Sequence, residues 1–563
     1  MICATDLHTY MYQYFVIFLG LGLLCSCTSP QLDEAPLMEA PQWQEVELSL
    51  TAAKTYDNPY RDIEMHAIFT SPDGSRLRRP AFWDGGQTWK VRFASPLSEG
   101  EWQWETYASD TTDTGLHGQR GLLKSIPNTG ENLWLQHGFL RMSPGGRNAV
   151  YADGTPFIMV GDTPWALPWR ATVEQTRIYA EDRQQKGFNA ALLMSLQPDR
   201  GATGPNARDT EQGFAVAFTD LPEGHINQPD VAYFQYMDSL MAVLVEHEIV
   251  PVYQPVFHGF GWKGKQVLGQ NVDAREYARY CKYLVARYGA RPAMWLVSGD
   301  GTGKAVGVKE GGEIVEEWDA YRQPAGIHYN PADDYIPDWA DESYEPHYNK
   351  SYQDAEWLDF QWAQTGHGAE HLYHKVERMY ENQPIKAVAN GEPTYEGIRE
   401  PGNGAGWWQG EEAWMQLMSG GTMGVVYGAG GIWQWKVTAA EEGWPDWANS
   451  QVSWQEALDL EGSRYVGYVA KALEGMPFAD IQKHPDLAGG KPCLAKSGEI
   501  YVSYLDNGGD VSLSELEPGL PYRWFNPKTG EFTGEGTTES ATQTFNAPDT
   551  NPWVLLVGEK QEI

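Results

Sequence analysis

The sequence predicts an α/β fold in which a (β/α)8 barrel is flanked by an N-terminal β-sandwich and a small C-terminal all-β domain. Three observations support this prediction. Apolar and polar residues alternate near both ends of the chain, strand-like apolar runs alternate with amphipathic helices between those ends, and the longest connections in that middle part all follow strands. With 563 residues, the chain is long enough for several folding units.

The sandwich is expected at residues 45–130. Apolar side chains alternate with polar ones at residues 46–50, 65–69, 89–93 and 102–104, and turn-forming clusters such as Ser71-Pro72-Asp73-Gly74 separate these stretches. This spacing is typical of antiparallel strands with one buried face. Residues 490–560 repeat the pattern at 500–504, 511–513, 522–524 and 554–556, and they form the predicted C-terminal β domain.

The barrel is expected at residues 137–480, where strands and helices alternate. Eight candidate strands lie at residues 157–161, 190–196, 250–256, 293–297, 326–329, 358–364, 385–390 and 424–433. Amphipathic helices separate them, with apolar residues three and four apart at 234–245 and 277–288. Thr172 with Gln175, and Asp273 with Glu276, fit capping boxes that mark where two helices begin.

Loop lengths favour a closed barrel over an open sheet. Connections from helix to strand are short, at 185–187, 288–291 and 383–384, whereas those from strand to helix are long, at 198–228, 299–312 and 331–355. In a closed barrel the long connections share the rim at the carboxyl ends of the strands, where such enzymes carry their active sites. A doubly wound open sheet is the alternative, but eight units without a dinucleotide-binding turn favour closure.

The composition excludes several classes of protein. Hydrophobic residues make up 42% and charged residues 21%, which excludes a disordered chain. The 76 Asp and Glu against 41 Lys and Arg give a net charge of −35, which would repel a nucleic-acid backbone, so we expect no nucleic-acid partner. The 24 Trp and 30 Tyr provide flat rings that suit stacking on sugars as well as core packing.

The first residues have the features of a secretion signal. Residues 15–24 are apolar but far fewer than the roughly 20 residues that span a bilayer. Leu24-Cys25-Ser26-Cys27 resembles a bacterial lipobox, in which Cys27 is lipidated, residues 1–26 are removed and residues 27–44 remain as a tether; against this, residues 1–14 contain no Lys or Arg. We expect a protein of the cell envelope, lipid-anchored at a periplasmic or outer-membrane surface, or a secreted one, with no other membrane contact.

No metal or cofactor is predicted. Cys281 and Cys493 lie in different predicted domains and show no metal-type spacing, so we expect buried thiols rather than a disulfide or a ligand pair. His371 and His374, with Glu377 after them, are expected on a surface helix away from the barrel rim.

Two acids end apolar strands at the predicted rim. Asp300 follows the fourth strand and Glu392 the seventh, which lie across the mouth of a closed barrel from one another. Cleavage of a glycosidic bond needs such a pair: one acid protonates the leaving oxygen while the other attacks the anomeric carbon or activates water. The alternative is that each acid only caps the turn after its strand. Asp162, after the first strand, either forms a turn before Pro164 or binds a sugar hydroxyl.

Several motifs around these acids resemble one known family. They are residues 139–141 and 295–300, Gly161-Asp162-Thr163-Pro164-Trp165, Pro255-Val256-Phe257-His258-Gly259, Gln364-Thr365-Gly366-His367 and Asn390-Gly391-Glu392-Pro393-Thr394-Tyr395-Glu396. Together they resemble the apiosidase-like glycoside hydrolases (glycoside hydrolase family 140, domain of unknown function 4038). Residues 45–127 resemble the domain of unknown function 5060, and residues 490–558 resemble the C-terminal β domain described as collagen-binding in this family.

The resemblance implies an activity and a role for each motif residue. The activity is hydrolysis of a glycosidic bond in a plant or algal polysaccharide or oligosaccharide, with Asp300 as acid/base and Glu392 as nucleophile of a retaining mechanism. The residues implied to contact the sugar are His258, Gln364, His367 and Tyr395 around the ring and Trp165 stacked on it, with Asp162 as the further candidate. Relatives tend to carry His-Pro after the fifth strand, where this chain has Asn330-Pro331.

Two other functions fit part of the pattern. A carbohydrate-binding lipoprotein without activity would need the aromatic residues but not both acids. A polysaccharide lyase would use a Tyr, His or Lys base, often with a metal, beside a uronic acid. The negative net charge disfavours an anionic substrate, and the basic residues expected at the rim are Lys263, Lys265 and Lys304.

Overall fold

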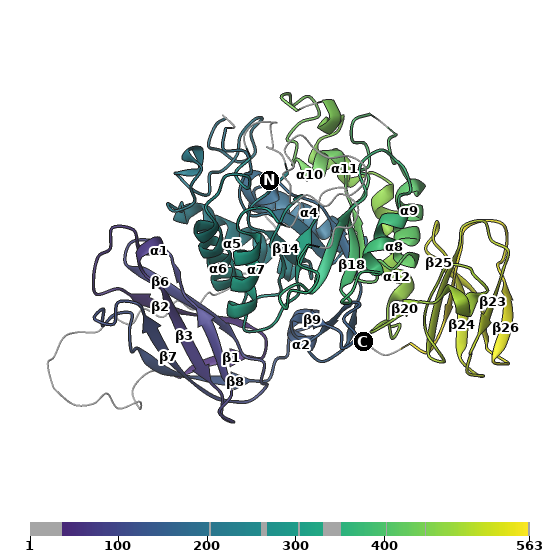
Figure 1. Cartoon of the computed structure of the whole chain (residues 1–563), viewed down its shortest axis with the longest axis horizontal. Coiled ribbons are helices and arrows are strands. Elements are labelled where there is room, and N and C mark those ends of the chain that lie inside the picture. The colour runs from purple at the N-terminus through teal and green to yellow at the C-terminus, as the bar shows by residue number, and fades with distance from the viewer. Residues whose placement is uncertain are drawn as a thin grey trace, which may run out of the picture. The chain divides into compact units, whose positions relative to one another are not determined.

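The computed structural model describes residues 37–201, 204–259, 267–301, 304–329, 351–400, 402–444 and 446–560, apart from the side chain at 447. Over these residues the predicted class is confirmed: a closed eight-stranded barrel lies between an N-terminal and a C-terminal β-rich region of the chain (Figure 1). The predicted signal peptide and Cys27 lie outside the described residues, as do Lys263, Lys265 and Asn330-Pro331. Lipid anchoring therefore stays a prediction.

The N-terminal domain is a sandwich of two sheets. Its elements are β1 (Met38–Pro41), β2 (Glu45–Thr51), α1 (Pro59–Asp62), β3 (Met65–Thr70), β4 (Arg76–Pro80), β5 (Phe82–Trp83), β6 (Thr88–Ala94), β7 (Gly100–Ala108) and β8 (Arg120–Ile126). The strand orders are β1-β8-β7-β3-β4 and β2-β6-β5, and Phe69, Phe93 and Trp102 belong to the core between them. β1 differs from the prediction, because Ala40 is fully buried and the strand pairs with β8, so the end of the expected tether belongs to the sandwich.

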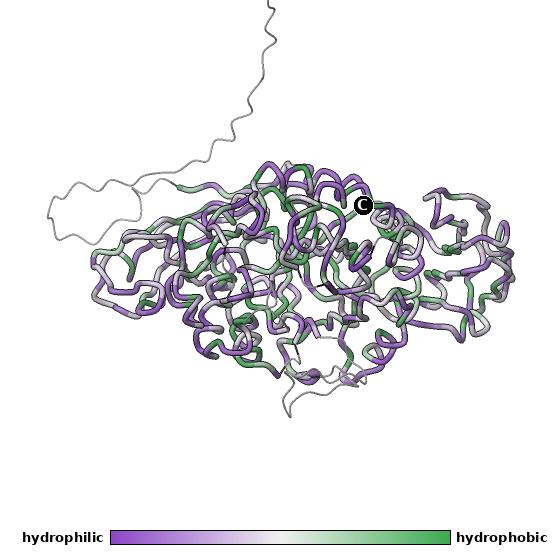
Figure 2. The backbone as a smooth tube through the Cα atoms, turned by 90° about the horizontal axis from the view of Figure 1, so that it is seen from above, coloured by the Kyte–Doolittle hydropathy of each residue, from purple (hydrophilic) through white to green (hydrophobic). Residues whose placement is uncertain are grey.

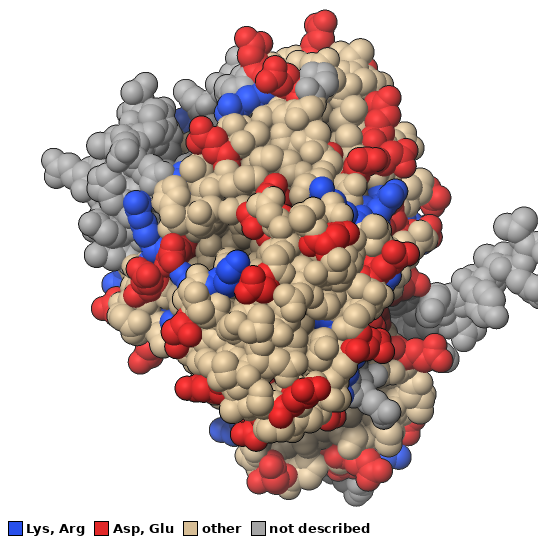
Figure 3. All heavy atoms as spheres, turned by 90° about the vertical axis from the view of Figure 1, so that its right-hand side faces the viewer, with Lys and Arg blue, Asp and Glu red and all other residues tan. Residues whose placement is uncertain are grey.

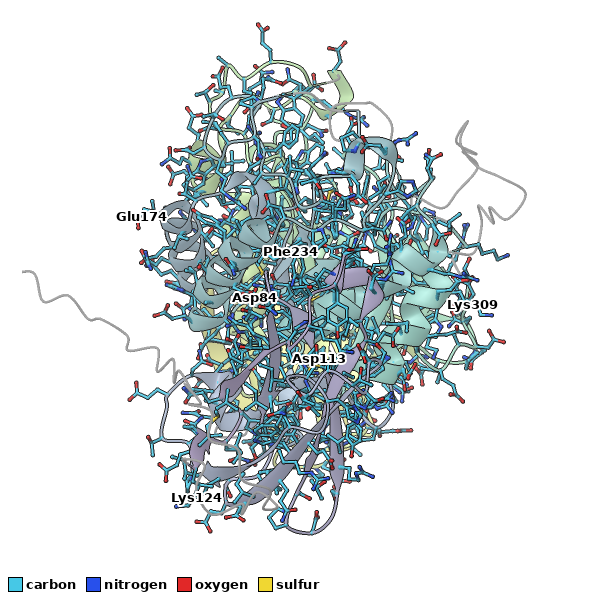
Figure 4. All side chains as sticks on the ribbon, turned by 90° about the vertical axis from the view of Figure 1, so that its left-hand side faces the viewer. Asp84, Asp113, Lys124, Glu174, Phe234 and Lys309 are labelled. Atoms are coloured by element: carbon cyan, nitrogen blue, oxygen red, sulfur yellow. The ribbon has the colours of Figure 1, made fainter. Side chains whose placement is uncertain are left out.

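A buried network of charges joins the sandwich to two helices of the barrel, α5 (Val231–Glu246) and α6 (Ala274–Tyr288). Arg92 of β6 places Nη2 2.7 Å from Oδ2 of Asp238 in α5, and Nη2 of Arg287 in α6 lies 2.8 Å from the same oxygen. Arg287 also reaches Oδ1 of Asp84 in the sandwich, at 3.0 Å. Figure 4 labels Asp84 and the buried Phe234 of α5. Each of these charged side chains is therefore paired with an opposite charge at the contact between the sandwich and the barrel.

We expect Asp238→Asn to lower the free energy of unfolding by about 3–5 kcal/mol, because it leaves two buried guanidinium groups without their shared carboxylate. Although burial raises the pKa of Asp238, Arg92 and Arg287 outweigh it and hold that pKa well below its usual range. The stabilisation is therefore present above the unfolded-state pKa of about 4 and is lost as the pH falls through the folded-state pKa. Urea unfolding followed by tryptophan fluorescence at several pH values measures both effects.

Glu174→Gln is the control for this experiment, since Glu174 projects from the outer face of a barrel helix with 73% of its side chain exposed (Figure 4). We expect its unfolding free energy to stay within about 0.5 kcal/mol of the native protein. Equal stability of the Asp238→Asn and Glu174→Gln proteins would contradict a stabilising role of the network.

The barrel closes by pairing its last strand with its first. Its strands are β12 (Met159–Asp162), β13 (Ala190–Met194), β14 (Val250–Gln254), β15 (Met294–Leu296), β16 (Ala325–His328), β17 (Phe360–Gln364), β18 (Ala387–Glu392) and β19 (Gly424–Tyr427), all in parallel. Side chains alternate along β13 and β14: Leu192 and Val252 pack in the interior, while Leu193 and Tyr253 pack against the helices. The predicted eighth strand, 424–433, was too long, because Gly430–Trp433 form the short helix α10.

A small sheet closes the amino-terminal end of the barrel. It contains β9 (Leu140–Met142), β10 (Ala149–Tyr151) and β11 (Pro156–Phe157) and follows α2 (Leu133–His137). Leu140, Tyr151 and Phe157 belong to the same apolar cluster as Met159 and Leu192 of the barrel interior. Apolar side chains therefore fill the barrel at the amino-terminal ends of its strands. The polar residues of the interior lie at the carboxyl ends.

Helices cover the outside of the barrel. They are α3 (Leu167–Arg170), α4 (Val173–Gln185), α5, α6, α7 (Val308–Trp318), α8 (His374–Tyr380), α9 (Trp407–Met418), α10, α11 (Trp454–Leu458) and α12 (Gly462–Leu473), with 3₁₀ turns at Leu221–Glu223 and Asp446–Ala448. The capping box of Thr172 and Gln175 is confirmed. The one predicted at Asp273 is only half present: Asp273 caps α6, but the Glu276 carboxylate accepts a hydrogen bond from Ile226 N, 3.1 Å away.

The C-terminal domain is all-β, as predicted. Its elements are β20 (Gln482–Lys483), a 3₁₀ turn (Pro485–Ala488), β21 (Cys493–Lys496), β22 (Ile500–Leu505), β23 (Asp510–Ser514), β24 (Pro521–Asn526), β25 (Glu531–Thr537), β26 (Thr542–Asn546) and β27 (Trp553–Val557). Cys281 and Cys493 are both buried free thiols. Within the described ranges no helix is both long and apolar enough to cross a membrane, and Figure 2 shows only short hydrophobic stretches. The likeness to collagen-binding domains stays a prediction.

Candidate active site

A β-bulge in β18 turns Glu392 toward the barrel interior. Ala387 and Ala389 pack in the interior, so simple alternation would place Glu392 on the outer face. Instead, Asn390 pairs with Ala363 and Glu392 pairs with Gln364, which leaves Gly391 without a partner. The extra residue shifts the alternation by one position. Glu392 therefore reaches the inner face, at the carboxyl end of the seventh strand.

Only glycine fits at this bulge, because there is no room for a side chain at position 391. A Cβ added to Gly391 would lie 1.4 Å from Nε1 of Trp362, whose ring is 1% exposed in the barrel interior. We expect Gly391→Ala to lower the free energy of unfolding by about 1–3 kcal/mol. We also expect it to reduce activity by about 100-fold, because displacement of the bulge misplaces Glu392.

Gly368→Ala is the matched control, because a Cβ added there meets no atom within 4 Å. Urea unfolding and hydrolysis rates of the two variants measure the difference. If Gly391→Ala matched the Gly368→Ala protein in both respects, the space-based explanation of the bulge would be wrong.

Both carboxylate oxygens of Glu392 face imidazole rings. Nε2 of His367 lies 3.1 Å from Oε1, and Nδ1 of the same ring lies 3.0 Å from the carbonyl oxygen of Pro393. Nε2 of His328 lies 2.9 Å from Oε2, although the ring N–H is not aligned as in a hydrogen bond. Burial alone would raise the pKa of Glu392, but its contacts with His328 and His367 outweigh burial and lower that pKa. Glu392 is therefore ionised at neutral pH.

Asp300 has the opposite electrostatic environment. It follows β15 with a φ of 47°, in the left-handed region that few residues other than glycine adopt. Oδ1 is buried without a hydrogen-bond partner, and Oδ2 lies so close to Gly259 that a Cβ there would be 2.2 Å away. Burial first, and then the negative charge of Glu392, raise the pKa of Asp300 well above its usual range. The two environments therefore favour the protonated form of Asp300 and the ionised form of Glu392.

The predicted aromatic residues form one connected group beside Glu392. Nε1 of Trp165 donates a hydrogen bond to Oη of Tyr395 at 2.8 Å, and the ring centres of Tyr395 and His367 are 4.5 Å apart. The ring of Trp165 lies 5.3 Å from that of His328. Because Trp165 and Tyr395 are only 2% and 1% exposed, both form a packed wall here, and stacking of Trp165 on a sugar stays a prediction.

Two further predicted residues also lie beside the acids. Gln364 is the neighbour of Glu392 across the strand pair, and its Oε1 is buried without a partner. Nδ1 of His258 accepts a hydrogen bond from Gly299 N, at 3.4 Å, next to Asp300. Burial lowers the pKa of His258 to about 4, which keeps the ring neutral. Buried polar atoms without partners need an explanation, and a polar ligand would provide one.

Asp162 does not face this group, and its assignment as a sugar ligand is wrong in this structure. Its Oδ2 lies 2.6 Å from Nε of Arg183 and accepts a hydrogen bond from Oη of Tyr179, both in α4, while Oδ1 accepts one from Thr163 N. The side chain is fully buried. Asp162 therefore compensates a buried arginine between the first strand and its helix, a role that neither of the two sequence-based alternatives proposed.

Sequence reasoning missed His328 and Gln254. His328 ends β16, and its Nδ1 lies 3.3 Å from Oε1 of Gln254, which ends β14. The signal was visible: each is a polar residue that ends an otherwise apolar strand, as Glu392 does. For the fifth strand, the sequence analysis had singled out Asn330-Pro331, two residues after His328, rather than His328 itself.

His371, one of the candidate metal ligands, lies away from the two acids and has other partners. His371 precedes α8 rather than lying within it, stacks on Trp408 at 4.6 Å, and places Nδ1 2.7 Å from Oε2 of Glu412. Burial lowers the pKa of His371, but Glu412 outweighs burial and the net shift is upward. In the part of the chain that the structure describes, no group of three or more His, Cys, Asp and Glu could hold a metal ion.

A (β/α)8 barrel with acids at the carboxyl ends of strands four and seven has the architecture of a glycoside hydrolase. Comparison with known families identifies which one: residues 143–480 match the apiosidase-like catalytic domain, and the chain belongs to this family. Residues 39–109 match the domain of unknown function 5060. Both matches confirm the likeness seen in the sequence motifs.

Solved structures show the same fold at low sequence identity. One titled "Glycoside hydrolase" is 19% identical, with a TM-score of 0.60 over 76% of this chain and 98% of its own. A glycoside hydrolase family 5 structure from Bacteroides vulgatus is 18% identical, with a TM-score of 0.61 over 76% and 94%. A "putative glycoside hydrolase" from the same species, also 18% identical, reaches 0.65 over 93% and 100%. No curated protein matches the sequence.

Proposed function

We propose that the protein hydrolyses a glycosidic bond in a plant or algal polysaccharide with retention of anomeric configuration. The Glu392 carboxylate attacks the anomeric carbon and forms a glycosyl ester, while Asp300 gives its proton to the departing oxygen. Asp300 then takes a proton from water, whose oxygen attacks the anomeric carbon, and Glu392 leaves as the carboxylate. The plant or algal origin of the substrate rests on the family resemblance.

The observation that carries this proposal is the difference between the two buried acids. His328 and His367 favour the ionised form of Glu392, whereas burial and the charge of Glu392 favour the protonated form of Asp300. A nucleophile must be ionised and a general acid must be protonated at the same pH.

Sugar binding is assigned to the polar groups that surround the acids. Gln364 Oε1 is buried without a hydrogen-bond partner, His258 lies next to Asp300, and His367 and Tyr395 lie beside Glu392. A sugar hydroxyl both donates and accepts, so it satisfies either kind of group. We therefore propose these four residues, with Trp165, as the lining of the ring-binding subsite.

The two alternatives predict different results. A carbohydrate-binding protein without activity would keep its affinity in Asp300→Asn and Glu392→Gln variants and release no product from any glycan. A lyase would form an unsaturated, ultraviolet-absorbing product from a uronic acid. Asp and Glu predominate over Lys and Arg on the surface shown in Figure 3, which agrees with an uncharged rather than an anionic polymer.

The test is a glycan release screen in which the Glu392→Gln protein is the blank. Proton NMR of the product within the first minutes then identifies the anomer that forms first. Release by the native protein alone, with the anomer of the substrate, supports the proposal. The inverted anomer would overturn retention, and identical traces from both proteins would remove Glu392 from the mechanism. For the location of this activity, we propose the cell envelope, with Cys27 as the lipid anchor.

A further inference from the structure

The contact between His328 and Glu392 depends on where one hydrogen lies. His328 is fully buried at the end of β16, with Nε2 2.9 Å from Oε2 of Glu392, and neither atom has an aligned hydrogen-bond partner. An ionised carboxylate only accepts hydrogen bonds. The two atoms therefore attract each other only when Nε2 carries hydrogen. Hydrogen bonds in a free active site are often poorly aligned and tighten when substrate binds.

Gln254 can partner Nδ1 of His328 while Nε2 carries hydrogen, whether the ring is charged or neutral. Nδ1 of His328 lies 3.3 Å from Oε1 of Gln254, and Nε2 of this amide is buried without a partner. A side-chain amide offers an acceptor and a donor, and a half-turn exchanges them. The oxygen accepts from Nδ1–H when the ring is charged, and the NH₂ group donates to Nδ1 when the ring is neutral. In both states Nε2–H faces Glu392.

His367, on the other oxygen of Glu392, lacks this freedom. Its Nδ1 lies 3.0 Å from the Pro393 carbonyl oxygen, and a carbonyl can only accept. His367 therefore satisfies both neighbours only when both ring nitrogens carry hydrogen. The two imidazoles beside Glu392 thus differ in the partner of Nδ1, which is an amide for His328 and a carbonyl for His367. Only His328 can satisfy that partner and still donate from Nε2 to Glu392 in both charge states.

We propose that His328 is a positioning residue for Glu392, whose carboxylate selects the ring form with hydrogen on Nε2, and that Gln254 holds the ring in place because its amide can partner Nδ1 whether the ring is charged or neutral. The carboxyl group of a glutamate turns through a broad torsional range unless a neighbour fixes it. Attack on an anomeric carbon needs one oxygen in line with it. This inference rests on the proposed function of Glu392 and adds the pair that holds it, contributed by strands three and five.

Kinetics of four variants test the proposal. We expect His328→Ala to lower kcat by about 100-fold with KM nearly unchanged, because the nucleophile is misplaced but the sugar still binds. His328→Gln, which restores an N–H near Nε2, should regain about tenfold. Gln254→Met, which removes the polar partner of Nδ1, should lower kcat about tenfold with KM nearly unchanged. Ile327→Val, on the outer face of the same strand, should match the native protein.

A measurement without substrate keeps this test separate from that of the proposed function. Long-range ¹H–¹⁵N correlation spectra of ¹⁵N-histidine-labelled full-length protein, with His328 assigned by the His328→Gln variant, should show its Nε2 protonated across the pH range. A neutral ring protonated on Nδ1 would overturn the proposal, as would a His328→Ala enzyme within threefold of native kcat. Failure of the native protein to release sugar would instead overturn the proposed function, and the spectrum would still decide the tautomer.

Discussion

Glu392→Gln is expected to lower kcat/KM by roughly four orders of magnitude or more, with the fold intact. The amide matches the carboxylate in shape but is a far weaker nucleophile, and it removes the charge that His328 and His367 face. Release of reducing sugar from the substrate found in the glycan screen measures the loss. Ligand affinity of the same variant, measured by calorimetry, should change far less, since the sugar contacts remain.

Glu396→Gln is the matched control, because Glu396 is a buried acid of the same motif with a structural role. Its Oε1 accepts a hydrogen bond from Gly406 N at 2.7 Å, and its Oε2 accepts one from Gly462 N at 3.0 Å. We expect this variant to lose stability and to keep turnover at temperatures where it is folded. Loss of turnover in the folded Glu396→Gln protein, equal to that of Glu392→Gln, would contradict a specific chemical role for Glu392.

Asp300→Asn is expected to slow hydrolysis by about 10²–10⁴-fold for a natural alcohol leaving group. The loss should be much smaller in the first step with an activated aryl glycoside, whose leaving group needs no proton. The native enzyme should lose activity as the pH rises through the raised pKa of Asp300, because only the protonated form donates. Asn does not titrate, so the variant should lack this alkaline limb.

The pH profile and the leaving-group dependence together identify the acid. Azide, a nucleophile that needs no general base, should accelerate turnover of an aryl glycoside by Asp300→Ala and give a glycosyl azide with the configuration of the substrate. An unchanged alkaline limb in Asp300→Asn would assign the general acid to another residue. Azide product of inverted configuration would contradict a covalent intermediate on Glu392.

The sequence was sufficient to predict the barrel, its two flanking β domains and the acids that end strands four and seven. These features follow from periodicity and loop length, which are local properties of the chain. Three features of the site are not local. The bulge at Gly391 depends on the position of Trp362 in the preceding strand, β17. The left-handed φ of Asp300 depends on its contact with the loop at Gly259, and the contacts of His328 depend on strands three and seven.

Asp162 is the opposite case: the sequence predicted a possible site residue, and the structure gives it a structural role. Its place after the first strand and its neighbours Pro164 and Trp165 fit a sugar ligand. Its partner Arg183 lies 21 positions later, on the helix that packs outside the barrel. A buried arginine that needs a carboxylate leaves no mark in the sequence around Asp162 itself. Polar residues at strand ends are therefore candidates for either role until the packing of their helices is known.

The ion pairs that join the sandwich to the barrel have a consequence for any attempt to separate the two domains. The stretch that matches the catalytic family, 143–480, includes Asp238 and Arg287 but neither Arg92 nor Asp84. An excised catalytic segment would keep half of a charge cluster and expose it to solvent. A different module in place of the sandwich would leave Asp238 and Arg287 with fewer partners unless it brought a guanidinium and a carboxylate to the same two helices.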